Sequence, residues 1–156
     1  LSNNSISEKE EQFLIAAAAI NLEEIQLGDL AQQKAIATEI KELGKMMKEA
    51  HSKSLEELVA LAQKKSIPIS TSPTETTQNA LIRLQSISDT DFDTEYCNMV
   101  VTAHKNAINV FEKACRQITD IEIKKWATAT LKELRKHLIY ARACQKKSGR
   151  IEITRE

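Results

Sequence analysis

The chain has 156 residues, and its 22 basic and 22 acidic side chains cancel to a formal net charge of zero. This length indicates one domain. Only 3 Gly, 2 Pro and 4% aromatic residues argue against β-sandwiches and barrels, which need frequent turns, and the 42% apolar content argues against intrinsic disorder. The longest apolar run, residues 13–20, is too short to cross a bilayer, so no transmembrane segment is expected.

The first 65 residues predict two long helices. Ser7 and Glu10 have the spacing of a capping box, in which each residue caps the backbone of the other at a helix start. Apolar residues then recur at steps of three and four over residues 13–31, which is the period of one helix face. The register breaks near residues 35–37 and a second stripe covers residues 40–62, so a short turn is expected between two helices.

The rest of the chain predicts a loop, a short helix and two more long helices. Residues 67–72 contain Pro68 and several β-branched residues, which favours a loop. Helix starts are predicted at Ser72–Glu75 and at the capping box Thr119–Glu122. The amphipathic stripes that follow the loop cover residues 80–87, 92–114 and 127–141.

These elements predict an all-α fold, an antiparallel up-down-up-down four-helix bundle with a short extra helix before the third long helix, because short connections leave long helices no other packing. The bundle domain is expected over 7–148, between a flexible N-terminal segment, 1–6, and a flexible tail, 149–156. Gly28 and Gly44 lie at similar distances from the first turn. They either let the first two helices approach closely or are tolerated at about 1 kcal/mol each.

Charge is segregated between the first and last helices. Residues 6–33 carry six acids and one lysine, whereas residues 119–150 carry nine basic residues and three acids. In an up-down-up-down bundle these two helices are neighbours, so their charges would complement each other. No aromatic residues alternate with the basic ones, and nucleic-acid binding is therefore not predicted.

Four polar residues interrupt the apolar stripes, one on each long helix: Glu24, His51, His104 and His137. If the turns near residues 36 and 118 share one end of the bundle, all four lie roughly 18–28 Å below that end. Side chains tilt toward the N-terminus of their helix, which brings the four closer together. We therefore expect three imidazoles and one carboxylate in one layer of the core.

Such a set can replace the water shell of a divalent transition ion, such as Zn, Fe, Mn, Ni or Cu, whereas Ca and Mg prefer oxygen ligands. With all four residues bound, the site would be closed and structural. If Glu24 stays outside the ligand set, a three-histidine site with an open position results. The alternative is a hydrogen-bonded polar core that fixes helix register without metal.

Other chemistry finds little support in the sequence. No histidine is preceded by Glu-x-x, which argues against a carboxylate-bridged di-iron centre, and no glycine-rich loop suggests a nucleotide. Two secondary candidates remain near His104. Tyr96 either reaches the histidine layer from one side or is a core tyrosine, and Asp93 fits a helix-start acid.

Several motifs together resemble a bacterial family described as domain of unknown function 4142. They are Phe13-Leu14 with Ala17, Asn21 to Gly28, Met46-Met47 before His51, Phe92-Asp93-x-x-Tyr96 with His104 eight residues on, and Leu131-x-x-Leu134-x-x-His137. The resemblance covers about residues 11–146, and the Phe-Asp-x-x-Tyr…His segment is its most specific part. The chain departs from the family's pattern at Ala50, where an acid is usual, and at Lys132, where proline is frequent.

The resemblance implies a ferritin-like helical bundle that is exported with a signal peptide and lies in the periplasm or at the outer membrane. Because the chain begins at Leu1 rather than Met, we expect that an N-terminal segment has been removed. The family has no established activity. The positions that the resemblance marks for testing are Glu24, His51, Asp93, Tyr96, His104 and His137.

The sequence thus predicts an exported, ferritin-like bundle that binds one divalent transition metal through His51, His104, His137 and Glu24, and that is more simply a binding protein than an enzyme. The first alternative is a non-catalytic structural or interaction module of the cell envelope, with an envelope protein or a second copy as partner. The second is a small redox or hydrolytic metalloenzyme, which would need an open coordination position and a pocket that reaches solvent.

Overall fold

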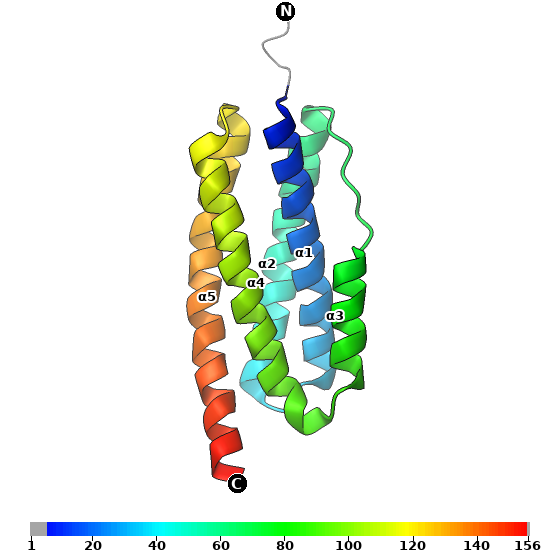
Figure 1. Cartoon of the computed structure of the whole chain (residues 1–156), viewed down its shortest axis with the longest axis vertical. Coiled ribbons are helices and arrows are strands. Elements are labelled where there is room, and N and C mark those ends of the chain that lie inside the picture. Colours follow the sequence, from blue (N-terminus) through cyan, green and yellow to red (C-terminus); the bar gives the residue numbers. More distant parts are fainter. Residues whose placement is uncertain (1–5, 156) are drawn as a thin grey trace, which may run out of the picture.

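The computed structural model of the chain describes the backbone of residues 6–155 and the side chains of residues 6–149. Most of the expected N-terminal segment, residues 1–5, and Glu156 lie outside the described residues. Over the described range the fold is all-α, as predicted, with a short helix before the third long one. The helices are α1 (Glu8–Lys34), α2 (Thr38–Lys64), α3 (Glu75–Ser86), α4 (Asp89–Gln117) and α5 (Ile121–Arg155). Figure 1 shows the four long helices side by side in a bundle.

The helix boundaries follow the sequence signals closely at the start of the chain and less closely later. The predicted capping box is present, since Ser7 Oγ accepts from the Glu10 amide and the Glu10 carboxylate accepts from the Ser7 amide. The cap of α3 is Thr74, and that of α5 is Asp120, whose carboxylate accepts from the Ile123 amide. The tail predicted from residue 149 onward continues the last helix, because α5 stays helical to Arg155.

Contacts at the two ends of the bundle set the direction of each long helix. At one end, Glu10 at the start of α1 accepts from the backbone amide of Asp120 at the start of α5, over 2.8 Å. Lys65, just after α2, pairs with the same Asp120 at 3.0 Å. At the other end, Lys147 near the end of α5 pairs with Glu39 at the start of α2. The helices α1 and α5 therefore run in one direction, and α2 runs in the other.

The prediction of up-down-up-down order is therefore wrong. The carboxylate of Asp93, at the start of α4, accepts from the amide of Ala37 in the turn between α1 and α2, so α4 runs in the same direction as α2. Residues 65–88, which follow α2 in the chain and include α3, return along the bundle beside α1 before α4 begins (Figure 1). The physical reason is that α3 and its preceding loop form a crossover, which lets two consecutive long helices share one direction.

The expected pairing of the acidic and basic helices is also wrong. The helix α1 packs on α2 and α4, and α5 packs on the same two helices, so α1 and α5 lie diagonally opposite each other. Basic residues of α5 instead find acids on other neighbours, as Arg135 does with Glu112 of α4. None of the described helices is both long and apolar enough to cross a membrane.

A close approach of α1 and α2 at two glycines fixes the relative position of these helices. A Cβ atom placed on Gly28 would lie 2.6 Å from the carbonyl oxygen of Gly44, and one on Gly44 would lie 2.7 Å from that of Gly28. Such distances are far inside van der Waals contact, and the clashing atoms are backbone. The interpretation that these glycines permit a close helix approach is thus confirmed.

Replacing Gly28 by alanine is expected to lower the free energy of unfolding by about 1–3 kcal/mol, because the two backbones must separate and disturb the packing around them. Chemical denaturation measures this change. Gly149→Ala is the matched control, since an added Cβ there would meet no neighbouring atom of the described residues within 4 Å, and a helical alanine there should stabilise by about 0.5–1 kcal/mol. Equal effects at the two positions would contradict this interpretation.

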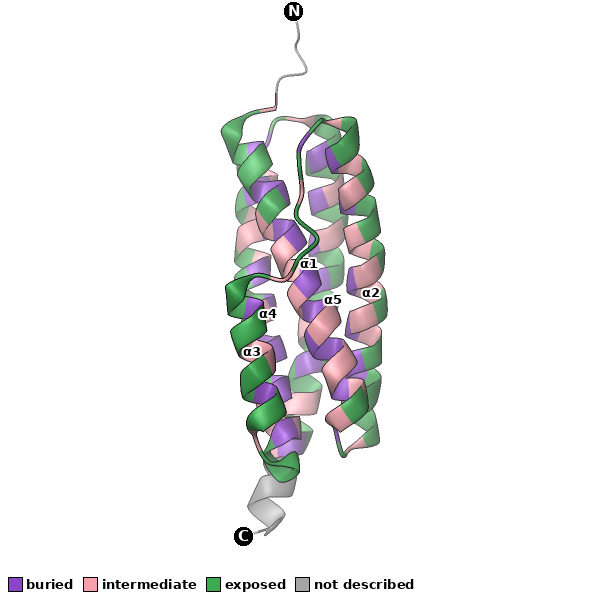
Figure 2. Cartoon of the chain, turned by 90° about the vertical axis from the view of Figure 1, so that its right-hand side faces the viewer, coloured by how far each residue is buried: buried purple, intermediate pink, exposed green. Residues whose placement is uncertain are grey.

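The core consists of two apolar clusters, one toward each end of the bundle. The first includes Phe13, Leu58, Phe111 and Leu134, and the second includes Leu27, Met47, Val100 and Ala141. On every long helix one polar residue of the predicted set lies between these clusters, and all four are buried. Figure 2 shows the buried residues as stripes along the helices. A polar layer therefore divides the apolar core.

Candidate metal centre

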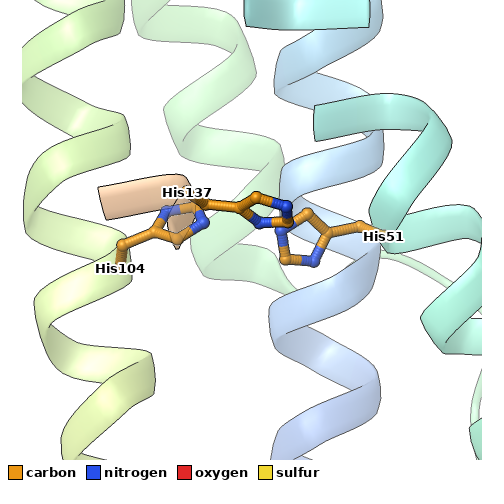
Figure 3. Close-up of side chains that lie close together, drawn as sticks. All are labelled: His51, His104 and His137. Atoms are coloured by element: carbon orange, nitrogen blue, oxygen red, sulfur yellow. The ribbon is translucent and has the colours of Figure 1, made fainter. Parts of the chain in front are cut away.

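Three histidines from three helices meet in this polar layer. His51 of α2, His104 of α4 and His137 of α5 have ring centroids 5.5 Å, 5.5 Å and 5.6 Å apart. Their rings point toward one another in Figure 3. Each offers one nitrogen, and these nitrogens all lie within 4.8 Å of one another. Within the part of the chain that the structure describes, these three nitrogens are close enough together to be candidate ligands of one metal ion.

The convergence does not depend on the helix directions that the sequence suggested. The depth estimate placed the turns near residues 36 and 118 at one end, whereas the structure places them at opposite ends (Figure 1). Each histidine nevertheless lies near the middle of the bundle, where its depth from either end is similar. Reversing a helix therefore moves such a residue by only a few ångströms along the axis.

Hydrogen bonds determine which nitrogen of two rings carries the proton. His51 Nδ1 lies 2.8 Å from Asn21 Oδ1, and His104 Nδ1 lies 2.9 Å from the carbonyl oxygen of Val100. Both oxygens can only accept, so each Nδ1 must donate. In the neutral rings, the lone pair is therefore on Nε2 of His51 and His104, which is the state in which imidazole binds a metal.

Each histidine also has one buried nitrogen without a hydrogen-bond partner in the described structure: Nε2 of His51, Nε2 of His104 and Nδ1 of His137. Buried polar atoms are nearly always paired, since an unpaired one costs about 1–3 kcal/mol. Three unpaired nitrogens in one place therefore lower the free energy of unfolding, and packing of the helices alone would not require them. For His51 and His104, the unpaired atom is the one that carries the lone pair.

Burial keeps the rings neutral near pH 7. Burial lowers the pKa of His51 well below its ordinary value, and the neighbouring histidines lower it further. Burial likewise lowers the pKa of His104 to about 4, although its hydrogen bond to Val100 opposes this. The pKa of His137 is also lowered by burial, with a smaller opposing effect of Glu133. No proton therefore competes with a metal ion at neutral pH.

Glu24 lies beside the triad rather than within it. Its side chain is buried, and its Oε1 is 4.0 Å from His104 Nδ1, which is not the free nitrogen of that ring. Neither carboxylate oxygen has a hydrogen-bond partner in the described structure, and burial, with a contribution from Glu23, raises the pKa of Glu24 to about 8. The group of ligand atoms within 4.8 Å of one another contains the three histidines without Glu24.

The two secondary candidates have different positions. Tyr96 is fully buried in the second apolar cluster, and its hydroxyl has no hydrogen-bond partner among the described residues. Burial raises its pKa well above the ordinary value, and Glu24 adds to this effect. Asp93 instead lies at the end of the bundle, where its carboxylate accepts from the amides of Ile36 and Ala37. Asp93 thus caps the start of α2, which has no side-chain cap of its own.

Asn21 is the site residue that the sequence reasoning missed. It is buried on α1, accepts from His51 Nδ1, and donates from its Nδ2 to Ser54 Oγ over 3.2 Å. A signal for it was present, because Asn21 lies three residues before Glu24 on the buried stripe of the same helix. A polar residue one turn from a buried acid is itself a candidate partner of buried histidines.

The family model described as "Domain of unknown function (DUF4142)" matches residues 1–144 of the 156. This range includes all four long-helix polar residues and the resemblance motifs around them. No curated protein matches the chain, and no solved structure matches it. The chain belongs to this family of unknown function, DUF4142.

Proposed function

We propose that the chain binds one divalent transition-metal ion through His51, His104 and His137. Two observations carry this proposal: the imidazoles of three helices offer nitrogens within 4.8 Å of one another, and each ring has one buried nitrogen without a hydrogen-bond partner among the described residues. Two of the rings have their other nitrogen held by an oxygen acceptor. That arrangement is usual for metal-binding histidines, because it fixes the tautomer and the ring orientation.

The donor set fits a borderline ion such as zinc. A tetrahedral ion with bonds of about 2.1 Å needs its nitrogens roughly 3.4 Å apart, so nitrogens that lie within 4.8 Å of one another would approach by about 1.4 Å at most. Such a movement requires only small side-chain rotations. Three neutral imidazoles suit Zn, Fe, Mn, Ni and Cu, and they disfavour Ca and Mg.

We further propose that Glu24 supports the site from outside the ligand set. With the ion on Nε2 of His104, the Nδ1 proton of that ring stays on the Val100 carbonyl oxygen, and the carboxylate of Glu24, 4.0 Å from the same nitrogen, would stabilise the positively charged ion and ring electrostatically. A carboxylate behind a metal-bound histidine raises the basicity of the ring. The positive ion would in turn favour the charged form of Glu24, which burial disfavours without it.

Metal content tests the proposal directly. Protein freed of metal with a chelator and then titrated calorimetrically with Zn²⁺ is expected to bind one ion per chain, with a rise in melting temperature. The protein purified without chelator should carry metal at a comparable ratio by elemental analysis. Titration without saturable binding near one equivalent, together with an unchanged melting temperature, would rule out the proposal.

Replacing Asn21 by alanine is expected to lower Zn²⁺ affinity about tenfold or more, because His51 loses the acceptor that fixes its tautomer. The same titration measures this loss. Asn98→Ala is the matched control, since Asn98 is an exposed α4 residue whose side chain accepts from Gln145 of α5 rather than from a histidine. If both variants bind Zn²⁺ as the wild type does, Asn21 does not position His51.

The alternative of a metal-free, hydrogen-bonded core finds one supporting observation, the network that joins Asn21 to His51 and Ser54 across α1 and α2. In a network that sets helix register, however, every buried polar atom should have a hydrogen-bond partner, because a network with unpaired atoms stabilises the fold less than an apolar core does. Six buried side-chain atoms have no partner in the described structure: both oxygens of Glu24, the Tyr96 hydroxyl and one nitrogen of each histidine. This pattern favours a site for an ion.

The cellular setting remains part of the proposal. Export to the periplasm or the outer membrane is supported by the family resemblance. A ferritin-like assignment is supported by the long crossover between α2 and α4, which is the connection that such bundles use. In this setting the chain would hold or buffer a transition ion, alone or with an envelope partner.

A further inference from the structure

A pocket of about 290 Å³ opens between α2 and α5 and reaches two of the three histidines. His51 and His137 contribute to its lining, whereas His104 does not. The contact between α2 and α5 is the least extensive of the four contacts between neighbouring long helices, which explains why an opening exists on this side. The triad is therefore buried but not sealed.

The opposite side of the triad is closed. His104 comes from α4, which packs on both α1 and α5, and Glu24 and Tyr96 are buried behind it. Three histidine nitrogens leave a tetrahedral ion one ligand short, and the group of potential ligand atoms holds no fourth member among the described residues. The direction in which solvent can reach the ion is thus the α2–α5 pocket.

We infer that the fourth coordination position of the ion opens into the α2–α5 pocket and holds a water molecule that small anions from solvent can replace. This inference rests on the proposed function. An ion with three protein ligands and one exchangeable water is the arrangement of catalytic rather than structural zinc sites, and it makes the bound water more acidic.

The lining of the pocket suits a small polar ligand. Ser54 and Thr130 line it, as does Lys53, for which no ion pair is seen among the described residues. Two acids also line it, but Glu57 accepts from the Trp126 indole and Glu133 pairs with Lys136. Because a water molecule takes about 30 Å³, the volume admits ligands of a few heavy atoms.

Cobalt and azide provide the test. Co²⁺ has visible absorption bands that respond to its ligands, so the metal-free protein would be loaded with one equivalent of Co²⁺ and titrated with azide. We expect a saturable change of the cobalt bands in the wild type. Ala50→Phe, which fills the pocket, should keep the Co²⁺ while its azide affinity falls about tenfold or more. Ala60→Phe, at an exposed position of α2 outside the pocket lining, is the matched control and should respond like the wild type.

The outcomes separate this inference from the proposed function. Failure of the wild type to bind Co²⁺ overturns both. Bound Co²⁺ whose spectrum ignores azide leaves the metal site standing and overturns the open position. An Ala50→Phe variant with wild-type azide affinity shows that the anion arrives by another route, which overturns the role of the pocket. Ala129→Phe, from the exposed opposite wall on α5, replaces Ala50→Phe if the latter does not fold.

Discussion

Replacing His104 by alanine should lower the affinity of the chain for Zn²⁺ by about a hundredfold or more. This histidine supplies one of three nitrogens, and the loss of a direct ligand should exceed the 10–100-fold typical of the residues that support ligands. His104 is also the ring nearest to Glu24, so the variant removes the contact through which that carboxylate would act. Calorimetric titration of the metal-free protein measures the change.

A control for general loss of packing is available one turn away. Val101→Ala removes volume at a buried position of the same helix without removing a nitrogen, so it should reduce stability while retaining Zn²⁺ affinity. Retention of Zn²⁺ by His104→Ala at wild-type affinity would show that the ion binds elsewhere. Equal loss in both variants would trace the effect to folding rather than to coordination.

Glu24→Gln is expected to stabilise the metal-free protein increasingly as pH rises. Burial raises the pKa of Glu24 from 4.5 to about 8, so the folded chain keeps the proton over a range in which the unfolded chain loses it. The stability that Glu24 retains below pH 4.5 is therefore lost as pH rises through the folded pKa. Glutamine does not titrate, and the free energy of unfolding of the variant should exceed that of the wild type by about 3 kcal/mol more at pH 8 than at pH 5.

The comparison uses the difference in free energy of unfolding between Glu24→Gln and the wild type at each pH. The contribution of the histidines is common to both proteins and cancels in this difference. Glu49→Gln, on the surface of α2, is the matched control, and its difference from the wild type should change little. A difference that does not grow with pH for Glu24→Gln would mean that the buried carboxyl has found a partner. With metal added, the same variant should bind Zn²⁺ about tenfold more weakly than the wild type, because the carboxylate behind His104 is lost.

The stability and the Zn²⁺ affinity of Glu24→Gln together show whether Glu24 serves metal binding or the stability of the fold. A residue kept for folding destabilises the chain when it is replaced, whereas Glu24 is expected to do the opposite and to weaken metal binding. Polar residues that violate the usual rules of core packing tend to mark functional sites. The polar layer between the two apolar clusters is such a violation, repeated on all four long helices.

Periodicity was sufficient to predict the helices and the polar layer. Both follow from local pattern, because a buried helix face repeats every three or four residues and an interruption such as His51 stands out on it. The helix directions were not predictable in the same way. The crossover through α3 looks in the sequence like a brief interruption, and only its packing beside α1 reveals a return along the bundle.

The side-chain contacts within the site could not be predicted from the periodicity of the sequence either. The identification of Asn21 as the partner of His51 depends on a contact between residues 30 positions apart, which the Gly28–Gly44 approach of α1 and α2 helps to fix. The position of Glu24 beside Nδ1 of His104, rather than among the free nitrogens, depends on side-chain orientation. Stripe position shows that a residue is buried, but it does not show which atom faces which neighbour.

X-ray absorption at the zinc edge of the loaded protein tests the account most directly, since it reports the atoms bound to the ion. We predict a low-coordinate shell of nitrogen and oxygen near 2.0 Å, approximately as zinc–histidine bonds require, with the outer scattering of three imidazoles that falls to two in His104→Ala. A shell of oxygen atoms without imidazole scattering, or a spectrum unchanged by His104→Ala, would contradict a shared ion among the three histidines.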